Sequence, residues 1–442
     1  MGIAPATAPL ATDALSSGYR KVTSRVIPLI FICYLFNYLD RVNVGFAKLQ
    51  MLSDLKMSET VYGLGAGVFF IGYVLAGVPS NLMLRRVGAR IWIAIIMCLW
   101  GALSASLLLV RTPESFYALR FLTGIAEAGF FPGMVLFLTQ WYPSARRGRA
   151  IALFMSAIPV SGVLGGPLSG WMLTHFAAGQ SGLAAWQWLF LLQGVPTVLL
   201  GVAVFFLLQD RIADATWLNE SEKAALAQAL ADDAAAHGSA AGKPQSATPV
   251  RDIVCNLAVW KFGLVYFSIQ MGVYAINFWL PTIIKSLGIG NDGMVGWLSA
   301  VPYLFAAIAM IVVGRSADAR RERRWHLSVP MAIGVAGLLI AARFDNQIAP
   351  AMIGLTLATS GALTALAMFW PLPTAVLAGT AAAGGVALIN SLGQIAGFVS
   401  PYIVGWIKDA THRTDIALYL LSSAMVVGFV LVMRTPARQV NR

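Results

Sequence analysis

The chain has 442 residues, of which 58% are hydrophobic and only 11% are charged. A soluble globular protein of this length needs more polar side chains to cover its surface. The composition therefore excludes that class and indicates a protein that crosses a membrane many times. The formal net charge of +12 is expected in the cytoplasmic loops of such a protein, so it gives no support for nucleic-acid binding.

Twelve hydrophobic stretches are long enough to cross about 30 Å of hydrocarbon as helices. They are residues 22–46, 60–84, 90–110, 114–138, 147–175, 186–208, 257–285, 294–314, 325–343, 348–371, 381–408 and 413–434. An even number of spans places both termini on one side of the membrane. We therefore predict an all-α membrane protein with twelve transmembrane helices.

The distribution of basic residues predicts the orientation. If both termini are cytoplasmic, the inner loops and tails outside the central polar segment hold 17 lysines and arginines, and the outer loops hold 7. Those seven are Lys48, Lys56, Arg111, Lys285, Arg343, Lys408 and Arg413. Because basic residues are retained on the cytoplasmic side, the sequence predicts a multi-pass protein of the cell inner membrane with both termini in the cytoplasm.

A long polar segment divides the chain into two sets of six spans. It begins with a predicted surface helix, in which Asn219 and Glu222 have the spacing of a capping box and Gly238 ends the helix. The following GSAAGKPQSATP is typical of a flexible linker. The expected order is a cytoplasmic tail (1–21), an N-terminal six-helix bundle (22–208), a cytoplasmic linker (209–254), a C-terminal six-helix bundle (255–434) and a second tail (435–442).

The two halves repeat each other weakly. The fifth span ends in GGPLSGW and the eleventh in SPYIVGW, and glycines four residues apart precede both endings, Gly162 with Gly166 and Gly393 with Gly397. Such glycines allow neighbouring helices to approach closely. Two parallel six-helix halves related by a pseudo-two-fold axis, with a binding site between them, are the architecture of the major facilitator fold.

The fourth span contains two charges, Arg120 and Glu127, within RFLTGIAEAGFFPG. A charged side chain at the membrane centre costs several kcal/mol (from about 3 to above 10), so it must face protein or water. Seven residues are almost two helical turns, so both side chains leave one face, about 10 Å apart and too far to pair directly. Asp40 and Arg41 in the first span are the expected partners, and we predict that these four charges form one cluster.

Five segments resemble the anion:cation symporter family of the major facilitator superfamily. They are YLDRVNVGFA, RFLTGIAEAGFFPG, WYPSARRGRAIALF, FWLPTIIKSLG and GVALINSLGQIAGFVSPYIVGWIKD. The chain looks most similar to bacterial members that import tartrate, galactonate, phthalate and related organic acids. The resemblance implies a proton gradient as the driving force, without a cofactor, and a monomer as the working unit.

The resemblance also implies roles for individual residues. Asp40 and Glu127 match the family's proton-carrying acids, and Arg41 and Arg120 match its functional arginines. Further residues match cavity-lining positions or are polar or aromatic residues within the later spans, where they would contact hydroxyl groups or a ring of the substrate. They are Tyr38, Tyr73, Tyr274, Asn277, Trp370, Asn390 and Gln394. Trp370 is equally explained as a packing residue, and which of Asn390 and Gln394 contacts the substrate stays open.

The four charges alone suggest a coupling chemistry. With both acids ionised they sum to zero, and arginine does not lose its proton. A carboxylate removed from water can bind a proton near neutral pH, which leaves a guanidinium without its partner. A substrate carboxylate can supply the missing charge to the planar arginine fork, and by linkage proton and anion then favour each other's binding.

This pattern predicts proton-coupled uptake of a tartrate-like, sugar-acid-like or aromatic carboxylate by alternating access. The alternatives on the same fold are an anion exchanger and a drug exporter. A membrane receptor or a membrane-embedded enzyme is disfavoured, because the sequence shows no extra soluble domain, nucleophile triad, zinc-ligand spacing or phosphate loop. The structural alternative is that the four charges only hold helices together. It is disfavoured because the desolvation of four buried charges costs much free energy.

Overall fold

The structure is a computed structural model that describes residues 8–176, 182–236, 251, 254–377 and 380–441. Within these ranges, twelve spans are long and apolar enough to cross a membrane, and each overlaps one predicted stretch. The helices are α1 (Ala8–Leu55), α2 (Glu59–Val87), α3 (Ala89–Ser106), α4 (Pro113–Glu127), α5 (Phe130–Thr139), α6 (Ser144–Met155), α7 (Ala157–His175), α8 (Ala185–Leu207), α9 (Glu220–Ala236), α11 (Leu257–Ser286), α12 (Asp292–Arg320), α13 (Arg324–Arg343), α14 (Ile348–Phe369), α15 (Pro371–Val376), α16 (Thr380–Thr411), α17 (Asp415–Met433) and α18 (Ala437–Val440). The predicted fold class is confirmed.

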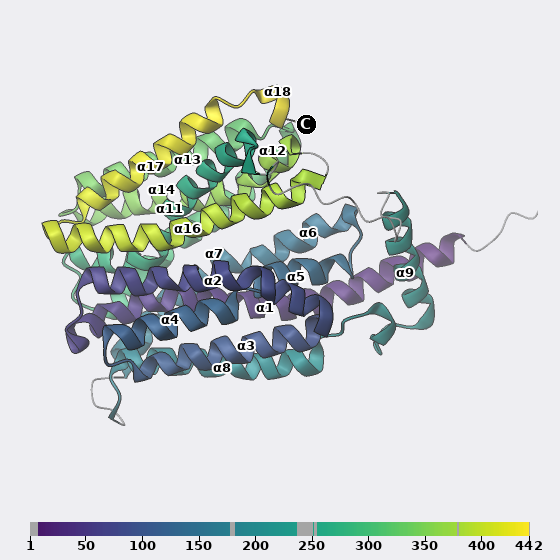
Figure 1. Ribbon diagram of the computed structural model, residues 1–442, viewed down its shortest axis with the longest axis horizontal. Coiled ribbons are helices and arrows are strands. Elements are labelled where there is room, and N and C mark those ends of the chain that lie inside the picture. The colour runs from purple at the N-terminus through teal and green to yellow at the C-terminus, as the bar shows by residue number, and fades with distance from the viewer. Residues whose placement is uncertain (1–7, 177–181, 237–250, 252–253, 378–379, 442) are drawn as a thin grey trace, which may run out of the picture.

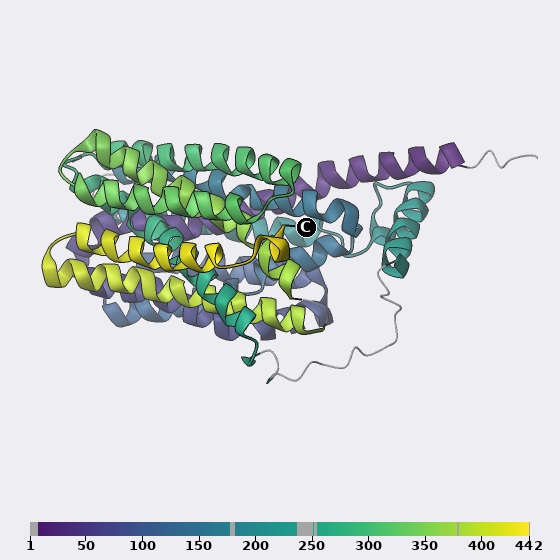
Figure 2. The ribbon, with the colours of Figure 1, turned by 90° about the horizontal axis from the view of Figure 1, so that it is seen from above.

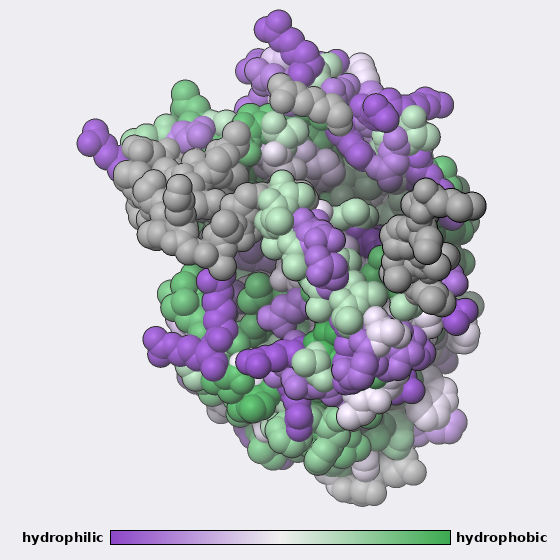
Figure 3. Space-filling model, turned by 90° about the vertical axis from the view of Figure 1, so that its right-hand side faces the viewer, coloured by the Kyte–Doolittle hydropathy of each residue, from purple (hydrophilic) through white to green (hydrophobic). Residues whose placement is uncertain are grey.

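The membrane helices form two bundles that lie side by side. Figure 1 shows α1 to α8 in one bundle and α11 to α17 in the other, and Figure 2 shows the same molecule from above. Both ends of the chain and α9 lie at one end of the molecule, which we call the termini end; the opposite end is the far end. Figure 3 views the termini end, where hydrophilic side chains gather over much of the visible surface.

Three of the twelve spans are interrupted next to a proline; in the tenth span, α15 begins at Pro371 after α14 ends at Phe369. A proline ring clashes with the carbonyl four residues earlier and offers no N–H to it. Pro132 therefore breaks the fourth span into α4 and α5 directly after Glu127, and Pro159 breaks the fifth span into α6 and α7. The break at Pro132 leaves Glu127 as the last residue of α4, near the middle of the span Pro113–Thr139.

The predicted close helix contacts are present at both glycine pairs. A Cβ atom on Gly166 would lie 2.5 Å from the carbonyl oxygen of Gly296, so α7 and α12 of opposite halves cross with their backbones in contact. Gly162 likewise meets the ring of Tyr303 across the halves, and Gly397 meets the ring of Phe70. Gly393 instead meets Tyr266 within its own half.

α9 is docked onto the N-terminal half. Asn219 and Glu222 form the predicted capping box. The backbone N–H of Asn219 donates to the Glu222 carboxylate at 3.0 Å, and that of Glu222 donates to the Asn219 side-chain oxygen at 2.8 Å. Glu222 also accepts hydrogen bonds from Ser17 and Lys21 of α1, both at 2.8 Å. The first helix therefore extends far beyond its apolar stretch to meet α9, which the sequence did not indicate. Gly238 and the predicted flexible linker lie outside the described residues.

The Glu222 contacts predict how docking of α9 depends on pH. The hydrogen bonds from Lys21, from the Asn219 backbone and from Ser17 lower the pKa of Glu222 from its ordinary value of 4.5 to about 2. A depressed carboxyl pKa means that the stabilisation is fully present above about pH 4.5 and is lost as the pH falls towards 2. Spin labels at the exposed Ser16 and Ala227 should therefore report a narrow distance distribution at pH 5 to 7 that broadens below pH 4.5.

A pair of variants provides the comparison. Glu222→Gln should broaden the same distribution already at pH 7, because it removes the ion pair with Lys21. The matched control is Glu220→Gln, whose side chain is 90% exposed and should change nothing. A narrow distribution in Glu222→Gln at pH 7 would show that apolar contacts alone hold α9.

Candidate functional site

An ion pair between α1 and α4 lies at the centre of the N-terminal half. Arg41 donates from Nε to Glu127 Oε1 at 2.7 Å, and its Nη2 contacts the same oxygen. Both side chains are buried, with 10% of Arg41 and 1% of Glu127 exposed. Such a pair is worth little to folding by itself, because desolvation offsets most of the attraction, but removing one partner leaves a costly buried charge.

Aromatic rings enclose this pair. The guanidinium carbon of Arg41 lies 5.3 Å from the ring centre of Tyr38, 5.6 Å from Phe69 and 5.5 Å from Tyr73. The guanidinium carbon of Arg120 lies 4.7 Å from the same Phe69 ring. One aromatic ring of α2 thus serves two arginines from different helices, at distances where the ring attracts a cation.

Arg120 is buried but has few hydrogen-bond partners. Its side chain is fully buried, with 1% of the residue exposed. Its only hydrogen bond among the described residues is from Nη2 to the backbone oxygen of Ala66, at a long 3.5 Å, and its Nε has no partner there. No carboxylate of the described residues lies within ion-pair distance of it. A buried guanidinium with unused donors has the charge and geometry to bind an anion.

Close backbone contact between α2 and α4 brings these groups together. A Cβ atom on Gly124 would lie 2.0 Å from the carbonyl oxygen of Phe69, so only glycine allows α4 to pack at this distance. Gly124 lies between Arg120 and Glu127 on α4. The glycine therefore lets Arg120 lie against the ring of Phe69.

The prediction of one four-charge cluster is wrong for Asp40. Asp40 accepts hydrogen bonds from Trp100 Nε1 at 2.9 Å, Ser104 at 3.1 Å and Thr197 at 3.4 Å, so it faces α3 and α8. No arginine lies within ion-pair distance of it among the described residues. The physical reason is that consecutive helical residues point about 100° apart, so Asp40 and Arg41 cannot both face α4.

The C-terminal half contributes a polar trio and a polar pair. Tyr274 donates to Gln394 Oε1 at 2.7 Å and accepts from Gln270 at 3.2 Å. Its ring lies 4.4 Å from that of Phe70, across the boundary between the halves. Asn277 accepts from the hydroxyl of Tyr303 at 3.0 Å, and its Nδ2 has no partner among the described residues.

Two predicted contact residues lie apart from these hydrogen-bonded groups. Trp370 packs between aromatic neighbours, 5.0 Å from the ring centre of Tyr266 and 5.3 Å from that of Phe369, which fits a packing residue. Asn390 is half-buried, and no hydrogen bond of its side chain is found among the described residues. Of the two candidates on α16, the structure thus places Gln394 in the central network with Tyr274 and Asn390 outside it.

The predicted placement of Lys48 in an outer loop is wrong. α1 continues to Leu55, and the Lys48 side chain is only 2% exposed. Its Nζ lies 2.6 Å from Glu59 Oε2. Lys408 and Lys285, also assigned to outer loops, pair with Glu59 at 2.5 Å and with Asp292 at 2.7 Å. Sequence reasoning missed this cluster because its members lie beside predicted span ends, where charges need no explanation.

The two halves are joined at the far end. Asp409 accepts from the backbone N–H groups of Glu59 and Thr60, and Gln50 donates to Asp292. Lys408 donates to Glu59, Lys285 to the Leu49 carbonyl, and Tyr62 to the Phe278 carbonyl. The residues on the N-terminal side of these hydrogen bonds lie in α1 and at the start of α2, on either side of the turn between them. The halves are therefore closed at the far end in this structure.

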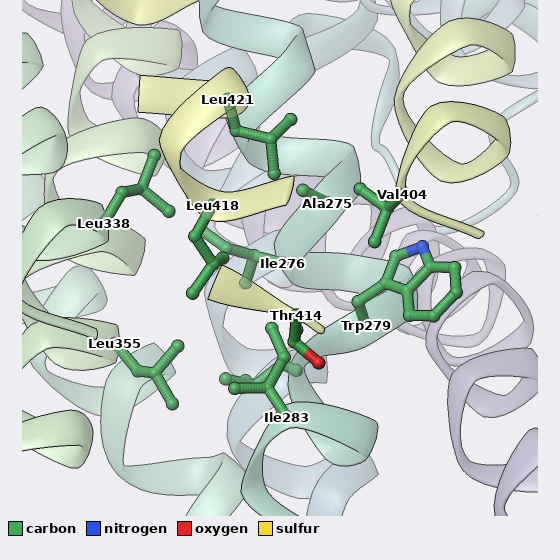
Figure 4. A pocket seen from close by; sticks show the side chains of 11 residues that line it. Ala275, Ile276, Trp279, Ile283, Leu338, Leu355, Val404, Thr414, Leu418 and Leu421 are labelled. Carbon is green, nitrogen blue, oxygen red and sulfur yellow. The ribbon is translucent and has the colours of Figure 1, made fainter. Parts of the chain in front are cut away.

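An apolar cavity lies within the C-terminal half. Figure 4 shows its lining, which includes Trp279, Ile283, Leu355, Thr414 and Leu421. Apart from Thr414 and the indole of Trp279, its lining side chains are aliphatic, so it does not suit an anion. The described residues also contain no group of three His, Cys, Asp or Glu side chains that could hold a metal ion.

Comparison with known proteins identifies the family. The sequence profile of the Major Facilitator Superfamily matches residues 30–438. The chain belongs to the Major Facilitator Superfamily. A bacterial homologue of the lysosomal transporter Spinster, solved in an inward-facing and occupied conformation, has the same fold: its TM-score is 0.73 at 14% identity, over 94% of this chain and 98% of that one.

Three curated relatives cover almost the whole chain. The "Putative metabolite transport protein NicT" of Pseudomonas putida is 47% identical over 96% of this chain and 95% of its own length. A "Putative tartrate transporter" of Agrobacterium vitis is 42% identical over 94% and 90%. The "Quinolone resistance transporter" of Acinetobacter baumannii is 39% identical over 93% of each. This superfamily member is a multi-pass membrane transporter.

The α7–α12 crossing predicts that a larger residue at Gly166 blocks transport. Gly166→Leu places its side chain where the Gly296 carbonyl lies 2.5 Å from the Cβ position, so the far end cannot close. We expect transport to be lost while the central charges stay intact. Spin labels at the exposed Ser53 and Thr411, one in each half, should report a longer distance than in the wild type.

Gly290→Leu is the matched control. Gly290 lies in the loop before α12, and a Cβ atom there would meet nothing within 4 Å. This variant should transport normally and keep the wild-type distance. Full transport by Gly166→Leu would show that closure at the far end does not require this crossing.

Proposed function

We propose that this superfamily member is a proton-coupled importer of an organic carboxylate. The observation that supports it best is Arg120, a buried guanidinium without a counter-ion among the described residues, beside the Arg41–Glu127 pair. A carboxylate has the charge that Arg120 lacks and the geometry that an arginine fork binds with two hydrogen bonds. The "Putative tartrate transporter" relative has a name consistent with such a substrate.

Glu127 couples the proton to the anion. When Glu127 is ionised, it neutralises Arg41, and the site has one free guanidinium. When Glu127 binds a proton, Arg41 loses its counter-ion, and the site then has two guanidinium groups on the shared ring of Phe69. The protonated site binds an anion more strongly, and the anion in turn favours protonation by linkage.

Neutral groups recognise the rest of the substrate. Tyr274, Gln394 and the unused Nδ2 of Asn277 offer hydrogen bonds to hydroxyl groups of a tartrate-like or sugar-acid-like substrate, and Tyr38 and Tyr73 offer ring faces to an aromatic carboxylate. Asp40 is proposed as a second proton site, which it would serve from its position against α3 and α8. No cofactor is needed, because the proton gradient supplies the energy.

The proposed setting follows from the charge distribution. The termini end is cytoplasmic, since the basic loops lie on that side, and the protein works as a monomer in the cell inner membrane. The far end then faces outwards. With the far end closed, the structure corresponds to the stage of alternating access in which substrate exchanges with the cytoplasm or is enclosed.

Transport in proteoliposomes tests the proposal. With a pH gradient, acidic outside, the purified protein should accumulate at least one of tartrate, galactonate and phthalate, and an uncoupler should abolish accumulation. Uptake that needs a second anion on the other side, and survives the uncoupler, would instead establish an anion exchanger.

A drug exporter is the second candidate. The 39% identity to the quinolone resistance transporter favours it, because similarity of this extent covers both halves. In the same vesicles, an exporter would expel a quinolone against its gradient and would show no stimulation by the three carboxylates. That outcome would overturn the carboxylate proposal.

A further inference from the structure

The cluster at the far end contains one carboxylate that serves two lysines. Lys48 Nζ lies 2.6 Å from Glu59 Oε2, and Lys408 Nζ lies 2.5 Å from Glu59 Oε1. Asp409 is nearby, but its two oxygens accept the backbone N–H groups of Glu59 and Thr60, at 3.1 and 2.7 Å. Each lysine is thus left with one oxygen of a shared counter-ion.

The donors of this cluster exceed the acceptors that Glu59 offers, since Lys48 has only one carboxylate oxygen of the described residues within ion-pair distance. Lys48 Nζ makes no aligned hydrogen bond among the described residues, although its side chain is only 2% exposed. The indole N–H of Trp279 is also buried without a partner there. A buried donor without an acceptor is unfavourable, so these donors can bind more anion than Glu59 supplies.

Two aromatic rings lie against the ammonium group of Lys48. Its Nζ lies 3.3 Å from the ring centre of Trp279 in the C-terminal half and 4.8 Å from that of Tyr62 in the N-terminal half. Lys408 Nζ lies 5.9 Å from the Trp279 ring. The two lysines and the indole therefore line a region between the halves that can bind a carboxylate with an apolar or planar substituent.

One face of α2 connects this place to the centre. Tyr62, Ala66, Phe69 and Tyr73 follow helical spacing along that face. Lys48 contacts its outer member, Arg120 contacts Ala66 and Phe69, and Arg41 contacts Phe69 and Tyr73. Seven residues correspond to about 10 Å along the axis. The three cations are thus ordered from the far end to the centre.

We propose that Lys48, Lys408 and Trp279 form a second anion site, the two-lysine site, which holds a carboxylate before it reaches the central arginines. Glu59 is the internal competitor of this site. In the closed far end its carboxylate takes the place that a substrate carboxylate occupies when the halves separate. Closure thus releases the bound anion towards Arg120. The proposal rests on the proposed function for the identity of the natural anion and for its passage to the central arginines.

Removing the competitor tests the site directly. Glu59→Ala takes away the shared carboxylate and leaves space between the lysines, so a small carboxylate from solution should bind in its place. The probe is sodium acetate, with sodium chloride at equal ionic strength as the salt control. The readout is the ¹⁹F resonance of 5-fluorotryptophan at Trp279 in the whole protein in lipid nanodiscs. This resonance is assigned by its loss in Trp279→Phe.

We expect acetate to shift the Trp279 resonance of Glu59→Ala saturably, with half-saturation at least tenfold below the concentration needed in the wild type. Adding Lys48→Met should abolish the shift, and adding Arg41→Lys should leave it unchanged, because Arg41 belongs to the central site. Glu59→Gln is the substitute if the alanine variant folds poorly. It keeps the side-chain volume, and its Trp279 resonance should also respond to acetate more strongly than that of the wild type.

Two outcomes would overturn the two-lysine site. One is equal shifts by acetate and chloride in Glu59→Ala and Glu59→Gln, which would mean screening only. The other is an acetate response that survives Lys48→Met. A closing contact without an anion site would give the first pattern, because acetate would then act no differently from chloride. Failure of the proposed function is distinguishable, since it would remove carboxylate binding that depends on Arg41 while leaving the Trp279 response in place.

Discussion

Glu127→Gln is expected to abolish proton-driven accumulation while anion binding persists. The amide keeps the shape of the protonated acid but neither binds nor releases a proton, and it leaves Arg41 without the counter-ion that it has in the structure. Each unit of pH gradient is worth about 1.4 kcal/mol per proton, or a tenfold accumulation. With a gradient of two units, the variant should therefore lose roughly a hundredfold accumulation per coupled proton.

The measurements are accumulation and binding in the same proteoliposomes. Binding of the accumulated carboxylate should become nearly independent of pH in Glu127→Gln, and exchange at equal pH should continue. Glu114→Gln is the matched control, because Glu114 is an exposed residue in the first turn of the same helix and should behave as the wild type. Wild-type accumulation by Glu127→Gln would assign the proton to another residue, and Asp40→Asn would be the next variant to measure.

Replacing Arg120 should change stability and binding in opposite directions. Arg120→Met removes a buried cation that has no counter-ion among the described residues and keeps much of its volume. Replacing buried charge by an apolar side chain of similar size is often neutral or stabilising by about 1–4 kcal/mol. Losing hydrogen bonds to a charged group costs about 1.5–3 kcal/mol, so carboxylate affinity should fall roughly 10- to 150-fold.

The checks are a thermal melt without substrate and a binding titration. Arg111→Met, an exposed residue just before α4, should leave both unchanged. Arg120→Lys distinguishes charge from shape, since an ammonium keeps the charge and loses the planar fork, and it should bind more weakly than the wild type. A lower melting temperature together with wild-type affinity in Arg120→Met would identify Arg120 as a structural residue.

Much of this fold can be predicted from local sequence. The twelve spans follow from apolar length, and the start of α9 follows from the Asn219–Glu222 capping box, because both depend on residues close together in the chain. The proline breaks after Glu127 and before Pro159 depend on equally local chemistry, so they too can be predicted from the sequence. The same applies to Asp40 and Arg41, whose adjacency already separates their directions by about 100°.

The far-end cluster could not be predicted in this way. Lys48 and Glu59 come from two helices of the N-terminal half, and Lys408 comes from a helix of the C-terminal half. No spacing in the sequence relates residue 59 to residue 408. Lys48 also ends an apolar stretch, where a lysine is ordinarily explained by the membrane surface. Its burial follows only from the length of α1 and from the position of Trp279 in the other half.

The docked pair of α1 and α9 has a practical consequence for imaging. A transporter of 47.2 kDa that lies almost wholly within a micelle gives particle images with few features by which to orient them. α1 has 48 residues, or roughly 72 Å at 1.5 Å per residue, which exceeds the thickness of the hydrocarbon core by a wide margin. Glu222 and Lys21 hold α9 against this protruding part. A binding epitope grafted onto the exposed face of α9, around Ala227 and Ala231, would therefore keep a fixed direction relative to the N-terminal half and serve as a fiducial for cryo-electron microscopy.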